Sequence, residues 1–315
     1  MDEPIGRERY QRLIAAAQNE ARIKVAVAHP CDEVSLRGAI EAHKLGLIDP
    51  ILVAPPERVR EAAKEAALDI AAFQTVASSH SHDSAAKAVG IVKAGGAEAL
   101  MKGSLHTDEL MGAVVSRESG IRTERRISHC FVMDVPRHAE ALIVTDAAVN
   151  IAPDLDAKVD IVQNAIDLAH AMGDAEVRVA LLSAMETVTA KVPSTVEAAA
   201  LCKMAERGQI TGALLDGPLA LDNAISPEAA AIKKIASPVA GRANVLVVPD
   251  LEAGNMLAKS LSFLAGADAA GIVLGARVPI ILTSRADSLL SRLASCAVAV
   301  MVAAARRKAS VSSVH

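Results

Sequence analysis

Side chains that can bind an anion or accept a proton gather near the C-terminus, at Thr283, Ser284, Arg285 and Asp287. The apolar run before them, residues 278–282, predicts a short buried strand, and a helix is expected to begin at or near Arg285. A strand-to-helix turn presents unpaired backbone N–H groups and the positive end of the helix dipole, which together favour phosphate. Arg285 can add a guanidinium fork that grips two phosphate oxygens. The segment therefore predicts a phosphate site; a helix cap by Ser284, with Arg285 on a solvated face, is the alternative.

Polar residues also follow two other predicted strands. Lys102, Gly103 and Ser104 come directly after the strand at 98–101, where a positive charge and a flexible turn could meet a phosphate. An ordinary strand-to-loop turn is the alternative there. Asn255 lies at a further predicted strand-to-helix turn, where it could bind substrate or cap the helix.

Histidines and glycines elsewhere do not complete a metal or nucleotide site. His29 ends the first predicted strand, but a lone histidine at such a place is more often a structural hydrogen-bonding group. His80, His82 and Asp83 lie close together, and a helix start explains them more simply than a metal does. The glycines of 266–271 have the spacing of a P-loop without its lysine and hydroxyl residue. We therefore expect no metal and no nicotinamide site of the Rossmann type.

Length and composition favour a soluble protein of two domains. The chain has 315 residues, of which 52% are hydrophobic and 22% charged, enough for a sizeable core. A formal net charge of −4 and few aromatic residues argue against nucleic acid binding. Four scattered cysteines and the lack of a signal peptide pattern favour a reducing cytoplasm. The apolar stretch 289–305 is short for a membrane span and contains Ser291 and Arg292, which favours a buried core helix.

Alternating strand and helix patterns predict an α/β fold with mostly parallel sheets covered on both faces. Two consecutive apolar segments, 127–135 and 141–144, break the alternation and are expected to pair without a helix between them. The break predicts two domains. The first would contain residues 1–139 and 292–315, and the second would contain residues 140–291 with the phosphate-binding turn.

Five segments carry a resemblance to a known family: LMKGSLHT at 100–107, DAAVNIAPDL at 146–155, DGPLA at 216–220, DLEAGN at 250–255 and LTSRADS at 282–288. In this order they resemble the sequence blocks of the phosphate acetyl/butyryltransferases, also called phosphotransacylases. The resemblance covers nearly the whole chain. It implies a two-domain fold like that of isocitrate and isopropylmalate dehydrogenases, with the active site in a cleft between the domains.

The resemblance also implies a reaction. The family transfers a short acyl group, such as acetyl or butyryl, between coenzyme A and inorganic phosphate. Coenzyme A would be a substrate, and no permanently bound cofactor is implied. In the direction of acyl-CoA synthesis, the thiolate attacks the acyl phosphate directly. Ser284 and Arg285 would hold the phosphate or acyl-phosphate end, and Thr283 would add a hydroxyl.

Three features depart from the acetyltransferase pattern. Ser291 stands where an acidic residue, seven positions after the serine, would be the proposed thiol base. Phe263 replaces one expected arginine, and Met111 or Gly112 replaces another. These departures are closer to the butyryltransferase branch, in which a less polar pocket would suit a longer acyl chain. Asp287 is the nearest substitute base, one turn inside a helix that begins near the serine; a carboxylate that complements the helix dipole is the alternative.

Two other functions stay open. A non-catalytic acyl-CoA or acyl-phosphate binding relative would explain the missing acidic base. A metal- and NAD-dependent dehydrogenase would use the related fold. The resemblance further implies a homodimer and leaves an enoyl-CoA hydratase as a possible partner, since some family members resemble fusions with such a domain. Neither a membrane nor nucleic acid is an expected partner.

Overall fold

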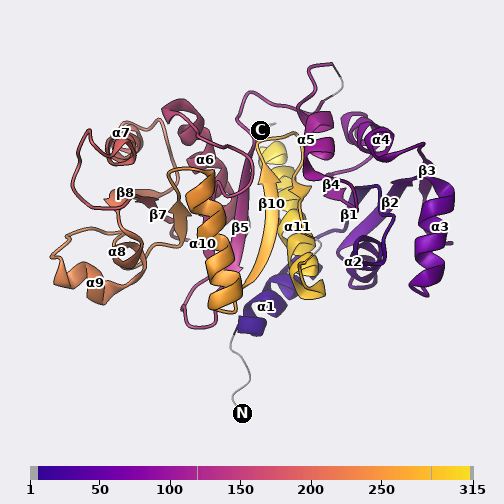
Figure 1. The fold of residues 1–315 in the computed structure, drawn as a ribbon, viewed down its shortest axis with the longest axis horizontal. Coiled ribbons are helices and arrows are strands. Elements are labelled where there is room, and N and C mark those ends of the chain that lie inside the picture. Colours follow the sequence, from indigo (N-terminus) through magenta and orange to yellow (C-terminus); the bar gives the residue numbers. More distant parts are fainter. Residues whose placement is uncertain (1–5, 119, 285, 313–315) are drawn as a thin grey trace, which may run out of the picture. The chain divides into compact units, whose positions relative to one another are not determined.

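The computed structural model describes residues 6–118, 120–284 and 286–312, which form two compact units of strands and helices (Figure 1). The N-terminal unit contains Tyr10–Arg125 and Ala270–His315, and the central unit contains Met1–Arg9 and Arg126–Ala269. Both units alternate strands with helices, so the predicted α/β class with mostly parallel pairing is confirmed.

Apolar strands form the sheet of the N-terminal unit, and all except the edge strand at Thr75–Ala77 are mostly buried. Their order is β3 (Thr75–Ala77), β2 (Ile48–Ala54), β1 (Ile23–Ala28), β4 (Ala99–Lys102), β11 (Ile280–Ile281) and β10 (Asp268–Leu274, in this unit from Ala270 on). Neighbours are parallel except for β10 and β11, which are antiparallel. The helices are α1 (Gly6–Gln18, in this unit from Tyr10 on), α2 (Glu33–Lys44), α3 (Pro56–Glu65), α4 (Ser81–Lys93), α5 (Thr107–Val115) and α11 (Leu289–Ser312).

The sheet of the central unit begins with an antiparallel pair. β5 (Ser128–Asp134) pairs with β6 (Leu142–Thr145), which confirms the prediction of two consecutive strands without a helix between them. From β6 the sheet continues through parallel pairs to β9 (Val245–Val247), β7 (Arg178–Leu182) and β8 (Leu214–Leu219). The helices are α6 (Leu155–Ala171), α7 (Pro193–Glu206), α8 (Leu221–Ile225), α9 (Pro227–Ile232) and α10 (Leu251–Leu264).

The boundaries between the two compact units differ from the predicted domain boundaries. The changes lie between Arg125 and Arg126 and between Ala269 and Ala270, whereas the predicted limits follow residues 139 and 291. The segment after β11 is grouped with the N-terminal strands because Ile280 and Ile281 pair with β4. The predicted division into domains, and the cleft expected between them, stay predictions.

The last helix, α11, begins at Leu289, so the expected start at or near Arg285 is wrong. Ser288 caps the helix, because its Oγ accepts the N–H of Ser291 at 3.1 Å. The start is delayed because Ser284 and Asp287 are joined by a separate contact before the helix, in which the Asp287 carboxylate accepts the N–H of Ser284 at 2.6 Å. Asp287 therefore lies before the helix, and its expected place one turn inside it is also wrong.

α11 is, among the described residues, the one helix that is long and apolar enough to cross a membrane, over Leu289–Ser310. Of its apolar window, 67% is buried inside the protein. The helix packs against α2 and β11 of the same unit. This burial is what the sequence predicted for a core helix.

Candidate functional site

The carboxyl ends of β1, β4 and β11 lie side by side because these three strands are parallel. The register pairs Ala28 with Lys102 and Met101 with Ile281, so two segments that the sequence marked separately share one edge of the sheet. Such edges are where α/β proteins bind ligands. We refer to five side chains at this edge as the strand-end cluster: Lys102, Thr283, Ser284, Asp287 and Arg292.

The turn after β11 presents one buried and one exposed hydroxyl. Thr283 is 5% exposed, whereas the Ser284 side chain is exposed to solvent. The N–H of Ala286 donates to Ser284 Oγ at 3.3 Å, and the N–H of Asp287 donates to the Ser284 carbonyl at 3.2 Å. The predicted phosphate ligand Arg285 lies outside the described residues. Ser284 is thus held by its backbone while its hydroxyl remains accessible.

Arg292 joins this turn to α11, and the sequence reasoning did not select it. The residue is 4% exposed. Nη1 donates to Thr283 Oγ1 at 2.9 Å, and Nη2 donates to the Ser284 carbonyl at 2.5 Å. A charge is rarely buried in a core without partners, so an arginine inside an apolar helix was the available signal. The sequence reading treated it only as an interruption of the apolar stretch.

The segment after β4 contributes a cation and a close contact between strands. Lys102 is buried, and its Nζ lies 3.4 Å from the Gly103 carbonyl. Gly103 approaches the end of β1 so closely that a Cβ there would lie 2.4 Å from the Ala28 carbonyl oxygen. Ser104 Oγ donates to the His29 carbonyl at 2.8 Å and accepts the N–H of Cys31 at 3.3 Å. Its hydroxyl therefore joins the segment after β4 to the loop after β1. The substrate role of Ser104 stays a prediction.

The charges of the strand-end cluster affect one another. Burial raises the pKa of Asp287, while the N–H of Ser284 and the cations Arg292 and Lys102 oppose the rise. Burial also lowers the pKa of the Arg292 guanidinium, against the attraction of Asp287 and Asp32. The turn that carries the exposed Ser284 thus contains one carboxylate, Asp287, on which two cations, Arg292 and Lys102, act. This excess of positive charge favours an anion.

His29 lies at the same edge and behaves as the structural group that the sequence favoured. Its ring is buried, and Nδ1 lies 2.9 Å from Ser84 Oγ. Arg58 Nη1 lies 3.4 Å from Nε2; since a guanidinium only donates, Nε2 is the acceptor and Nδ1 carries the proton. Burial, and next to it the charge of Arg58, lowers the pKa of His29, which favours the neutral ring.

Asn255 and Ser291, two positions that the sequence singled out, have local structural contacts. Asn255 lies on α10 of the central unit, where its Nδ2 donates to the Ala147 carbonyl at 3.4 Å. Ser291 is buried beside Ser288, whose Oγ donates to it at 3.2 Å. Ser291 is therefore a packed residue of the first helical turn. The substrate role of Asn255 stays a prediction.

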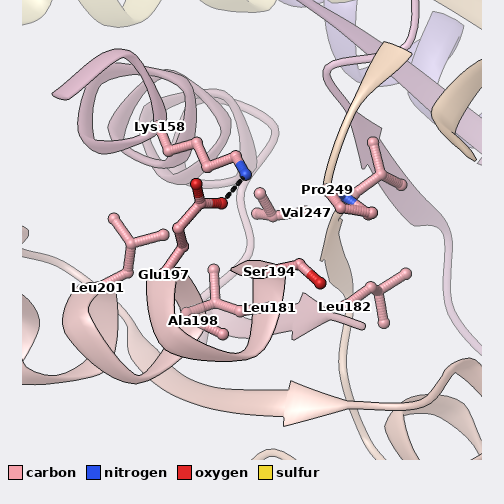
Figure 2. A pocket seen from close by; sticks show the side chains of 10 residues that line it. Lys158, Leu181, Leu182, Ser194, Glu197, Ala198, Leu201, Val247 and Pro249 are labelled. Carbon is pink, nitrogen blue, oxygen red and sulfur yellow. Dashed lines mark hydrogen bonds and ion pairs between the residues drawn. The ribbon is translucent and has the colours of Figure 1, made fainter. Parts of the chain in front are cut away.

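A pocket in the central unit lies at the carboxyl ends of β7 and β9 (Figure 2). Its empty volume, open solvent included, is about 220 Å³, and its walls are mostly apolar side chains of β7, α7 and β9. Lys158 of α6 points to Glu197 of α7 and forms an ion pair with it, the two side chains being 6% and 30% exposed. The described candidate residues do not line this pocket, so we interpret its ion pair as a structural contact.

We expect Glu197→Leu to lower the free energy of unfolding by about 2 kcal/mol, because it leaves the Lys158 charge buried without its partner. The double variant Lys158→Met/Glu197→Leu should recover most of that loss, since an apolar pair needs no desolvation of charge. Urea unfolding of the intact chain measures both. The control is Glu206→Leu on the same helix, whose pair with Lys203 is 63% and 61% exposed and should change stability by less than about 1 kcal/mol. Equal effects of Glu197→Leu and Glu206→Leu would contradict the prediction.

Comparison with protein families matches residues 74–300 to the family described as phosphate acetyl/butaryl transferase. Over 311 residues the chain is 66% identical to a phosphate acetyltransferase from Rhizobium meliloti, which spans 99% of this chain and 98% of that protein. It is 38% identical to a phosphate butyryltransferase from Clostridium acetobutylicum, over 93% of this chain and 98% of that protein.

Solved structures are also similar to this chain. A branched-chain phosphotransacylase from Enterococcus faecalis V583 superposes with a TM-score of 0.78 at 31% identity, over 89% of this chain and 99% of that one. A 4-hydroxythreonine-4-phosphate dehydrogenase from Klebsiella pneumoniae has a TM-score of 0.55 at 11% identity, over 90% of this chain and 99% of that one. The second similarity concerns the fold alone, and it agrees with the expected likeness to a dehydrogenase fold.

Proposed function

The chain belongs to the phosphate acetyl/butaryl transferase family, and on this premise we propose that it moves an acetyl group between coenzyme A and inorganic phosphate by direct thiolate attack. It is an acyltransferase, as are its full-length relatives, and coenzyme A and phosphate are its substrates. The observation that carries the proposal is the strand-end cluster, in which Ser284 is exposed and the buried cation Arg292 donates to its carbonyl group. The choice of acetyl is supported by 66% identity to an acetyltransferase against 38% to a butyryltransferase.

In the direction of acetyl-CoA synthesis, the thiolate sulfur forms a bond to the carbonyl carbon of acetyl phosphate. The bond from that carbon to the phosphate oxygen then breaks, and phosphate leaves with the electron pair. Negative charge develops on the carbonyl oxygen in between, and the Ser284 hydroxyl can donate to it or to the phosphate. The charge of Lys102, which acts on Asp287 of the same turn, would stabilise this negative charge, and Arg285 is proposed from the sequence as the phosphate ligand. No metal is needed for this scheme.

The thiol, with an ordinary pKa of about 8.5, must lose its proton before the attack. We propose that Asp287 removes this proton, because its carboxylate lies in the same turn as Ser284 and burial raises its pKa, which makes it a stronger base than an exposed aspartate. One carboxylate oxygen accepts the N–H of Ser284, so the side chain is oriented beside the proposed catalytic hydroxyl. The usual acidic position holds Ser291, which is buried and cannot take the proton.

Asp287→Asn should lower turnover in acetyl-CoA synthesis by about 100-fold, the contribution of a positioned general base. In the wild type the rate should fall as the pH drops through a pKa above the ordinary value of 3.8, and the variant should lack this acid limb. Because folding raises the pKa of this acid, the stability of the wild type relative to Asp287→Asn should fall as the pH rises through the same range. Full turnover in the variant would show that Asp287 is not the base, and that water or another group accepts the thiol proton.

The proposed reaction is tested by following release of free thiol from a series of acyl-CoAs, acetyl to hexanoyl, with and without phosphate. We expect phosphate-dependent release that is fastest with acetyl-CoA. A maximum at butyryl-CoA would assign the protein to the other branch, which the replacement at Phe263 favours. Coenzyme A binding by calorimetry without any turnover would leave a binding protein that lacks the chemistry. Reduction of NAD by a 2-hydroxy acid would indicate a dehydrogenase instead.

We also propose a cytoplasmic homodimer without membrane or nucleic acid partners. The absence of paired cysteine motifs supports the compartment, and the family resemblance supports the dimer. Light scattering should give about twice the chain mass of 32.6 kDa. Co-purification with an enoyl-CoA hydratase would support the partner that the resemblance suggested.

A further inference from the structure

Arg292 holds the turn after β11 from inside the protein. Its two terminal nitrogens reach two consecutive residues, with Nη1 at 2.9 Å from the Thr283 hydroxyl oxygen and Nη2 at 2.5 Å from the Ser284 carbonyl oxygen. A guanidinium is planar and its N–H groups point in fixed directions. The fork therefore sets the position of the side chain of one residue relative to the backbone of the next.

Burial of this guanidinium costs desolvation free energy, and its hydrogen bonds offset only part of that cost. The residue is 4% exposed, and its Nε is buried without a hydrogen-bond partner among the described residues. The aliphatic part packs against Gly38 of α2, where an added Cβ would lie 3.2 Å from Arg292 Cδ. A buried charge with an unsatisfied hydrogen-bond donor contributes little to stability. The presence of Arg292 at this position therefore needs another explanation.

The direction of the hydrogen bonds supplies that reason. Because a guanidinium can only donate, Thr283 Oγ1 accepts from Arg292 and its own proton is directed to a different acceptor. The Ser284 carbonyl accepts from both Arg292 and the N–H of Asp287, so this peptide group is fixed while the serine side chain stays exposed. Two hydroxyls are thereby presented with a defined geometry, one as an obligatory donor.

We propose that Arg292 is a positioning residue for the phosphate end of the reaction. It acts through Thr283 and Ser284, which it orients toward phosphate or the phosphoryl group of the acyl phosphate. This inference rests on the proposed function and adds a residue to it. Coenzyme A binding does not depend on the fork.

The test compares Arg292→Lys and Thr283→Val in phosphate-dependent thiol release from acetyl-CoA. Lysine keeps the charge but cannot reach both oxygens in a planar fork, so kcat/KM for phosphate should fall about 50-fold, the equivalent of one charge-assisted hydrogen bond. KM for acetyl-CoA should change less than about threefold. Thr283→Val removes the oriented hydroxyl, so it should raise KM for phosphate and thereby lower kcat/KM for phosphate. The double variant should be little worse than either single variant.

Arg306→Lys is the matched control. Arg306 lies on the same helix, about 20 Å further along it, and its Nη1 donates to two oxygens as well, in this case the backbone carbonyls of Ala276 and Arg277. This variant should keep wild-type kinetics.

Three results would overturn the proposal: wild-type phosphate KM in Thr283→Val, unchanged kcat/KM in Arg292→Lys, or additive effects in the double variant. The Thr283→Val result decides even if the Arg292 variant does not fold. Lack of turnover in the wild type would instead refute the proposed function, and this role with it.

Discussion

Ser284→Ala is expected to lower phosphate-dependent turnover by about 100-fold or more, the usual loss on removing one donor from a developing oxyanion. Ser284 is exposed just after the carboxyl end of β11, and the described contact of its hydroxyl is a long hydrogen bond of 3.3 Å from the N–H of Ala286. Stability should hardly change, because the turn is closed by the Ser284 backbone and the Asp287 carboxylate. Thiol release and thermal unfolding of the same preparation measure both quantities.

Ser288→Ala should do the opposite: we expect it to lower stability and to leave turnover nearly unchanged. Its hydroxyl caps α11 by accepting the N–H of Ser291, so its loss should lower stability by about 1 kcal/mol and change turnover less than about threefold. If Ser284→Ala instead lowers stability and leaves turnover intact, Ser284 is a structural cap and the phosphate-binding interpretation of this turn is wrong.

Gly103→Ala should destabilise the protein by about 3 kcal/mol and abolish most of its activity. A Cβ at this position would lie 2.4 Å from the Ala28 oxygen and 2.5 Å from the His29 oxygen. Both atoms belong to the backbone, so the ends of β1 and β4 must separate. That movement would break the hydrogen bond from the Gly103 N–H to the Ala28 carbonyl, 2.9 Å long, and displace Lys102 beside it.

Urea unfolding and thiol release at saturating phosphate test this expectation. The control is Gly90→Ala on α4, where an added Cβ meets nothing within 4 Å and alanine should raise helix stability by up to about 1 kcal/mol. A stable and active Gly103→Ala variant would show that the two strand ends can part without harm to the strand-end cluster.

Several residues of the proposed site were selected from the sequence. The apolar run before Thr283 and the polar turn after it identified Ser284 and Asp287, and Lys102 was selected independently at the end of another strand. The positions of these residues follow from local pattern, because hydrophobic periodicity marks strands and polar residues mark their ends. The choice of His29 as a structural group followed from the same reasoning. The roles of Ser284 and Asp287 came from the family resemblance and stay predictions.

Other features depended on contacts between distant residues. The pairing of β11 with β4 brings Ile281 beside Met101 across about 180 positions of sequence, and no local pattern predicts such a neighbour. The same packing assigns the Ser104 hydroxyl to the loop after β1.

The sequence by itself determined the α/β class, the family and the turn that carries Ser284, because these follow from periodicity and from short motifs. Tertiary structure decided where α11 begins and what Arg292 does. The carboxylate of Asp287 closes the turn and delays the helix, and the Arg292 fork reaches back to Thr283 only when the helix packs beneath it. Hydrogen-bond directions of buried charges are set by their surroundings in space, so they become readable only in the folded protein.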